Sequence, residues 1–183
     1  MSDLWVFGYG SLMWRPGFEH AERQPALLRG AHRSLCVYSV VHRGTESRPG
    51  LVLGLDAGGS CRGIAFRVPA RDAGGTLDYL RAREQVTMVY RETHRQIELL
   101  GASPGKVEAV CFIVDRSHPQ YAGRLPIARQ AEIVRDGQGV SGHNVDYVVN
   151  TLSHIHEMGL QEPALSEVVA SLDERPALTP MRA

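Results

Sequence analysis

The stretch Val6–Pro16 reads Val-Phe-Gly-Tyr-Gly-Ser-Leu-Met-Trp-Arg-Pro and continues a short apolar run that begins at Leu4. The apolar residues Leu4–Phe7 predict a strand, and Gly8 and Gly10 allow the backbone behind it to turn sharply and to approach a ligand closely. Such a turn exposes consecutive N–H groups, which can hold a carboxylate or an oxyanion. A plain tight turn after a first strand explains Gly-x-Gly equally well, so the two glycines alone leave binding open.

The composition limits the classes of protein to consider. The chain has 183 residues, enough for one domain with a sizeable core, and its formal net charge is zero. A balanced charge predicts neither a nucleic-acid partner nor an anionic membrane surface. No apolar run has the length of a membrane span, and the first residues lack the pattern of a signal peptide.

Cysteine usage points to a reducing compartment. Cys36, Cys61 and Cys111 are odd in number and far apart, and no Cys-x-x-Cys pair occurs. This pattern fits buried thiols better than disulfides or a zinc site. We therefore expect a cytoplasmic protein.

The order of elements indicates the fold class. Strands are expected over Leu4–Phe7, Ala26–Val41 (as one strand or two), Leu51–Leu55, Gly63–Val68, Val86–Leu100 and Lys106–Val114, with a turn at Asp56–Gly59. Helices are expected over about Ala73–Arg83 after an N-cap at Asp72, Ile127–Arg135, His143–Met158 ending before Gly159, and Leu165–Leu172. Strands dominate, with one early helix and the others late. This order predicts an α+β domain with a mixed or largely antiparallel sheet curled into a barrel. The domain should span residues 1–160, and residues 161–183 should form a partly irregular tail.

Two familiar kinds of site are not supported by their context. Gly137–Gly142 matches Gly-x-Gly-x-x-Gly, but it follows a predicted helix rather than a strand, and no βαβ unit surrounds it. A loop that ends one helix and caps the next is the better interpretation, with Ser141 or Asn144 near the N-cap. The eight histidines are scattered without metal-ligand spacing, so no metal site is expected.

One carboxylate falls on an apolar helical stripe. Counting from Leu77, Leu80 is at i+3 and Glu84 at i+7, which places all three on the face expected to point inward. A glutamate there either reaches solvent at the helix end, pairs with Arg81 or Arg83, or is buried for a purpose. Periodicity does not decide between these alternatives.

Four motifs in order resemble those of the ChaC-type γ-glutamylcyclotransferases. They are Tyr9–Pro16, Leu80–Glu84 with Tyr90 shortly after it, the Pro-x-Tyr segment in His118–Gly123, and Val140–Tyr147, which is close to Ser-Gly-x-Asn-x-x-Tyr. The match extends over about Leu4–Met158. Two departures are visible: Gln85–Val89 replaces a more glycine-rich turn, and the tail after Gly159 has no counterpart.

The resemblance implies a γ-glutamylcyclotransferase-like fold and the cleavage of glutathione into 5-oxoproline and Cys-Gly, with no cofactor and no metal. It implies that Glu84 is the catalytic acid and base, and burial should raise its pKa. The implied substrate-binding residues are Tyr9, Gly10, Ser11, Leu12, Met13, Trp14 and Tyr121. Tyr121 is expected to donate a hydrogen bond, and Gly10 to have a positive φ or to lie close to the ligand. Two alternatives stay open, a non-catalytic small-molecule-binding regulator on the same fold and a cyclotransferase for other γ-glutamyl amines.

Overall fold

The computed structural model describes residues 2–173, in two compact units. The first unit comprises residues 2–38 and 52–124, and the second comprises residues 39–51 and 125–173. Every residue expected to act on a substrate lies in the first unit, whereas the Val140–Tyr147 motif lies in the second.

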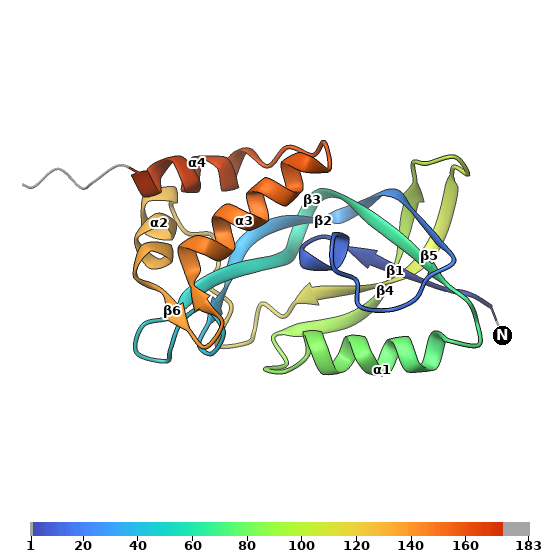
Figure 1. The fold of residues 1–183 in the computed structure, drawn as a ribbon, viewed down its shortest axis with the longest axis horizontal. Helices are drawn as coiled ribbons and strands as arrows, with labels where there is room; N and C mark the ends of the chain where they lie inside the picture. The colour runs from blue at the N-terminus through green and yellow to red at the C-terminus, as the bar shows by residue number, and fades with distance from the viewer. Residues whose placement is uncertain (1, 174–183) are drawn as a thin grey trace, which may run out of the picture. The chain divides into compact units, whose positions relative to one another are not determined.

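The first unit is built on a closed five-stranded barrel (Figure 1). Its strands are β1 (Leu4–Gly8), β2 (Glu22–Ser39), β3 (Gly50–Val68), β4 (Tyr90–Leu99) and β5 (Gly105–Val114), in the order β1-β3-β2-β4-β5. Strand β1 pairs antiparallel with β3 and parallel with β5, and this second pairing closes the barrel. The expected mixed barrel is therefore confirmed.

Alternating burial along the strands fills the barrel with apolar side chains. Phe7, Phe66 and Phe112 come from β1, β3 and β5 and are almost completely buried, as is Ile97 on β4. The paired strands thus fix the direction in which β1 enters the turn that follows it.

Two expected boundaries are wrong. Residues 56–59 do not separate two strands, because β3 runs without a break from Gly50 to Val68. Gly58 and Gly59 have φ values of 95° and 69°, so the strand bends locally while its pairing continues. The strand expected from Val86 begins only at Tyr90, because residues 85–89 form a turn.

Helix α1 (Ala73–Glu84) lies against the barrel and is joined to β4 by an ion pair between Arg81 and Glu92 (Figure 1). Asp72 occupies the expected N-cap position, but its carboxylate pairs with Arg71 and makes no capping hydrogen bond. Leu80 is fully buried and Leu77 is half-buried, so the predicted stripe does face inward.

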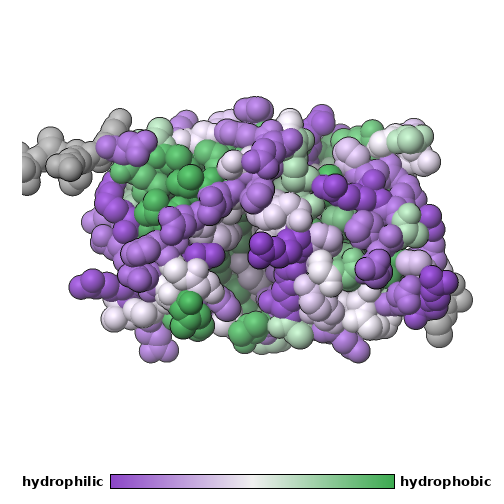
Figure 2. All heavy atoms as spheres, viewed as in Figure 1, coloured by the Kyte–Doolittle hydropathy of each residue, from purple (hydrophilic) through white to green (hydrophobic). Residues whose placement is uncertain are grey.

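The second unit contains three helices and a short hairpin. The helices are α2 (Ile127–Asp136), α3 (Asn144–Glu157) and α4 (Pro163–Asp173), and the hairpin is β6 (Gln138–Gly139) with β7 (Gly142–His143). The helices pack on one another, and Figure 2 shows apolar side chains gathered over them. The expected tail extends into residues 174–183, which lie outside the described residues. None of the helices within residues 2–173 combines the length and the apolar character that a membrane span requires.

The Gly137–Gly142 segment is the hairpin that links α2 to α3. Asn144 begins α3, and its buried side-chain amide bonds both backbone groups of Leu51, at 2.7 Å to N and 2.8 Å to O. Nothing in this arrangement resembles a nucleotide-binding βαβ unit.

Candidate active site

The turn after β1 is shaped by a close backbone approach at Gly8. A Cβ added at Gly8 would lie 3.1 Å from the Leu12 Cβ and 3.3 Å from the Met13 N. The chain then passes through a single 3-10 turn, η1 (Ser11–Met13), whose first bond runs from the Met13 N–H to the Gly10 O over 2.9 Å. The first amides of such a turn have no partner inside it, so those of Ser11 and Leu12 are not used by the turn itself.

Gly10 differs from the conformation expected for it. Its φ is −128°, not positive, and an added Cβ would meet no protein atom within 4 Å. The protein itself therefore does not require glycine here for space. Close approach of a ligand to Gly10 stays a prediction.

The side chains of the turn divide into two groups. Tyr9, Leu12 and Met13 are buried and anchor the turn, whereas Ser11 is exposed and Trp14 is partly exposed. A small molecule on the outer face of this turn therefore meets backbone atoms together with Ser11 and Trp14.

Arg33, on β2, holds the turn from inside the barrel. Its Nε donates to the Tyr9 O over 2.5 Å, and its Nη2 donates to the Arg62 O over 2.7 Å and lies 3.8 Å from the Met13 Sδ. The side chain is buried. This clamp fixes the carbonyl of Tyr9 and so orients the amides that follow it.

Glu84 is the last residue of α1, and its side chain is only 16% exposed. Burial raises the pKa of its carboxyl, and the positive charge of Arg83 opposes part of that rise. A raised pKa brings a carboxyl group closer to the range in which a general acid and base works at neutral pH.

The two arginines beside Glu84 have different partners. The Arg83 Nε lies 3.3 Å from the Glu84 Oε1, while Arg81 pairs with Glu92 on β4 at 2.7 Å. Arg83 also donates to the Ser11 Oγ over 2.9 Å. The turn after β1 and the end of α1 therefore share one cation, and this contact brings Glu84 and the opening motif together.

The turn that follows Glu84 contains the unusual residue Met88. Met88 has a φ of 60° and is the one non-glycine residue with positive φ within residues 2–173. Its N–H donates to the Gln85 O over 3.3 Å, and the side chains of Val86 and Met88 are largely exposed. This is the segment where the sequence departs from a glycine-rich turn.

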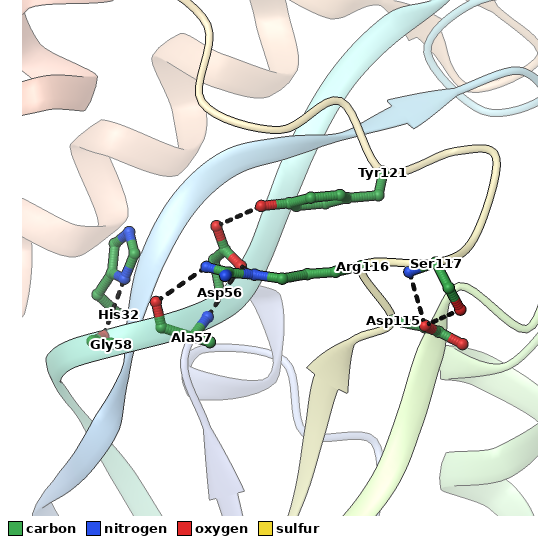
Figure 3. A network of polar contacts seen from close by, with 8 residues as sticks. All are labelled: His32, Asp56, Ala57, Gly58, Asp115, Arg116, Ser117 and Tyr121. Carbon is green, nitrogen blue, oxygen red and sulfur yellow. Dashed lines mark hydrogen bonds and ion pairs between the residues drawn. The ribbon is translucent and has the colours of Figure 1, made fainter.

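Tyr121 packs in an apolar cluster that also contains Val89, close in sequence to Glu84. Its hydroxyl donates to the Asp56 Oδ2 over 2.9 Å, and the guanidinium of Arg116 lies 5.8 Å from the ring centroid (Figure 3). Within residues 2–173 Tyr121 forms no hydrogen bond or ion pair with Glu84 or with residues 9–14. Its proton is engaged by Asp56 rather than left free for a ligand.

Asp56 is the centre of this network (Figure 3). Its carboxylate accepts hydrogen bonds from the Arg116 Nε at 2.7 Å, the Ala57 N–H at 2.8 Å and the Tyr121 hydroxyl. Burial alone would raise the pKa of Asp56, but these three bonds outweigh burial and lower it. Asp56 is therefore a carboxylate. Burial and the hydrogen bond to Asp56 both raise the pKa of Tyr121, so its phenol stays protonated.

Sequence reasoning missed Arg33 and Asp56. Arg33 shares the alternating face of Leu35 and Val37 in β2, so a charge on an apolar face was a visible signal. Asp56 gave no such signal, because it was assigned to a turn. No group of three or more His, Cys, Asp or Glu side chains within residues 2–173 is arranged to hold a metal ion.

Comparisons with known proteins identify the family of the chain. The sequence model of the family described as ChaC-like protein matches residues 4–175. The glutathione-specific gamma-glutamylcyclotransferase of Escherichia coli (strain K12) is 34% identical over 170 residues, covering 92% of this chain and 72% of that protein. Glutathione-specific gamma-glutamylcyclotransferase 1 of Homo sapiens is 31% identical over 160 residues, covering 86% of this chain and 72% of that protein.

The fold has a counterpart among solved structures. The crystal structure of the gamma-glutamyl cyclotransferase specific to glutathione from yeast gives a TM-score of 0.83 at 19% identity, covering 94% of this chain and 96% of that chain. At this identity the likeness shows the fold alone. The match of the family over nearly the whole chain is the stronger finding, and by it the chain belongs to the ChaC-like protein family.

Proposed function

We propose that this protein is a glutathione-specific γ-glutamylcyclotransferase that releases 5-oxoproline and Cys-Gly, and that Glu84 is its general acid and base. One observation carries the assignment of Glu84. It is a largely buried carboxyl group with a raised pKa, joined through Arg83 to Ser11 in the turn after β1. The names of the relatives in Escherichia coli and Homo sapiens support glutathione as the substrate.

The reaction needs no nucleophile from the protein. The α-amine of the γ-glutamyl group attacks its own γ-carbonyl, a C–N bond closes the five-membered ring, and the amide bond to cysteine breaks. Glu84 takes a proton from the α-ammonium group and returns it to the leaving cysteine nitrogen, and the second proton that the ring nitrogen loses is taken up by the amine of Cys-Gly, which leaves as its ammonium form. Proton transfer of this kind contributes about 10²–10⁴-fold, and holding the bent substrate in attack geometry contributes up to roughly 7–11 kcal/mol.

We assign the γ-glutamyl head group to the outer face of the turn Tyr9–Trp14. Backbone amides from Gly10 onward are suited to the carboxylate or to the oxyanion that develops on the γ-carbonyl. Tyr9, Leu12 and Met13 act by anchoring this turn from the barrel side. Tyr121 closes the site as an apolar wall whose oxygen accepts a hydrogen bond.

The same proposal includes the domain and the compartment. Residues 1–160 carry the activity, and residues 161–183 are not needed for chemistry. Cys36, Cys61 and Cys111 are all buried free thiols, which supports a reducing cytoplasm. No protein, nucleic-acid or membrane partner is required for the reaction.

A panel of γ-glutamyl compounds tests the proposal and separates it from both alternatives. Purified protein is incubated with glutathione, γ-glutamyl amines and γ-glutamyl amino acids, and products are identified by mass spectrometry. We expect 5-oxoproline and Cys-Gly from glutathione and little product from the others. Turnover of another γ-glutamyl amine in preference to glutathione would show that glutathione is not the main substrate. Binding of these compounds without any product would favour a non-catalytic regulator.

A further inference from the structure

Arg83 has an unusual number of partners for a side chain at the end of a helix. Its Nη1 donates to the Arg15 O over 2.8 Å and to the Pro16 O over 3.1 Å, and its Nη2 donates to the Ser11 Oγ over 2.9 Å. Three points of the segment that leaves the turn are thus held by one guanidinium.

Tyr79, one helical turn earlier, completes the attachment. Its hydroxyl accepts from the Arg83 Nη1 over 3.0 Å and lies so close to Gly17 that an added Cβ would be 2.0 Å away. The ring of Tyr79 also meets that of Phe18 edge-on, with centroids 6.4 Å apart. Residues 11–18 are therefore fastened along α1.

The fifth contact of Arg83 is the carboxylate of Glu84, at 3.3 Å from its Nε. The planar guanidinium presents its donors in a fixed fork, so the positions of its partners are linked to one another. A lysine would keep the charge near Glu84, but a single ammonium cannot reproduce the fork.

We infer that Arg83 is the positioning residue of this site: it fixes the turn that receives the γ-glutamyl head group at a set distance from Glu84 and supplies the positive charge beside that carboxylate. The inference rests on the proposed function only for the role of Glu84 in turnover. The structural half, a turn immobilised by Arg83, holds whatever the reaction is.

Two substitutions and one control separate the two contributions of Arg83, which are holding the turn and supplying a positive charge beside Glu84. Arg83→Gln removes both the fork and the charge, while Arg83→Lys removes the fork alone. Arg81→Gln is the matched control, because Arg81 lies on the same helix, pairs with Glu92 on β4 and, within residues 2–173, forms no hydrogen bond or ion pair with the turn.

Turnover gives the first readout. Arg83→Gln should lower kcat/KM by roughly 10–100-fold, the loss typical of a misplaced substrate. It should also move the acid limb of the pH profile to higher pH, because Glu84 loses the neighbouring cation. Arg83→Lys should return the acid limb toward that of the parent while KM stays raised, and Arg81→Gln should change neither.

Measurements without substrate give the second readout. Amide hydrogen exchange of Met13 and Arg15, whose N–H groups bond the Gly10 O and the Ser11 O, should become faster in both Arg83 variants. The carboxyl carbon of Glu84, followed by NMR, should titrate at higher pH in Arg83→Gln alone. A folded Arg83→Gln protein with parental exchange and titration would overturn the inference, as would full recovery of KM in Arg83→Lys. If the parent forms no 5-oxoproline, the proposed function fails, while exchange and titration still decide the role of Arg83.

Discussion

The hydroxyl of Tyr121 donates its proton to the Asp56 Oδ2 over 2.9 Å, so the oxygen of Tyr121 faces any ligand with lone pairs only. The family resemblance implies a donor at this position. The geometry favours an acceptor, which suits the N–H groups of an α-ammonium or an amide. Asp56 therefore influences which groups of a substrate Tyr121 can bind.

Asp56→Asn tests how much the hydrogen bonds of Asp56 contribute to the free energy of unfolding. The substitution keeps the shape but leaves Arg116 without its carboxylate, so the free energy of unfolding at pH 7 should fall by about 1–3 kcal/mol. The folded-state pKa of Asp56 lies below its unfolded value, so its contribution is present above the unfolded-state pKa and is lost as pH falls through the folded one. In urea unfolding, the difference in the free energy of unfolding between Asp56→Asn and the parent should shrink below about pH 4. An equal difference at pH 7 and at low pH would contradict this.

Glu84→Gln should separate catalysis from stability. The amide cannot move a proton, so formation of 5-oxoproline should fall by about 10²–10⁴-fold. The raised pKa means that the folded state prefers protonated Glu84, so stability is lost as pH rises from the unfolded-state pKa through the folded one. The variant should therefore be at least as stable as the parent at pH 7 in thermal unfolding. Near-full activity would rule out Glu84 as the base.

The same raised pKa fixes the pH profile of the parent. Because Glu84 must be ionised to accept the ammonium proton, kcat/KM should decline on the acid side at a pH above the usual range for glutamate. An acid limb within that usual range would contradict burial of the working carboxylate.

Gly8 and Gly10 should respond differently to substitution. Gly8→Ala places a Cβ against Leu12 and the Met13 N–H and should lower the melting temperature. A Cβ added at Gly10 would meet no protein atom within 4 Å, so Gly10→Val should stay folded yet abolish turnover by obstructing the ligand. Ser11→Ala should keep a measurable fraction of activity, because binding there is through backbone. Full activity in Gly10→Val would remove the turn from the substrate site.

Met88→Gly should relieve a backbone conformation that side chains disfavour. A non-glycine residue in the left-handed conformation destabilises the folded state by roughly 1–2 kcal/mol. Glycine removes this cost, but its greater freedom in the unfolded chain lowers the free energy of unfolding by about 0.4–1 kcal/mol. A small net gain in the free energy of unfolding is expected, since the Met88 side chain is mostly exposed. Chemical denaturation measures it, with Val86→Gly as the control that should lose stability.

Chelation should leave the reaction unchanged. The mechanism uses a carboxyl group and backbone amides, so treatment with EDTA followed by removal of the chelator should not alter the rate of 5-oxoproline formation. Activity lost to EDTA and restored by Zn²⁺ would overturn the mechanism.

The sequence predicted the elements whose boundaries are set by neighbouring residues, such as a terminating glycine or an apolar run. Helix α3 ends before Gly159, whose φ of 72° is the left-handed conformation that the pattern indicated, and β1 matches its apolar run. Residues 56–59 and 86–89 were misassigned for different reasons. Pairing with neighbouring strands carries β3 through two glycines, while Met88 adopts a turn that its residue type does not favour.

The site was predictable in part. The stripe of Leu77, Leu80 and Glu84 pointed to the carboxylate, and Arg83 was one of two partners considered for it. The choice between Arg81 and Arg83 depended on β4 passing beside α1, which no spacing within the helix can reveal. The Asp56 network joins residues far apart in the sequence and became visible only in the folded chain.

The burial of the cysteines bears on how this protein coexists with a thiol substrate. Burial raises the pKa of Cys36 and of Cys111 to about 12. At neutral pH Cys36 and Cys111 are therefore almost entirely thiols, which do not attack disulfides, and all three cysteines are buried. Oxidised glutathione should therefore form no mixed disulfide with Cys36 or Cys111, so the redox state of the glutathione pool should act on the rate only through the concentration of the reduced substrate.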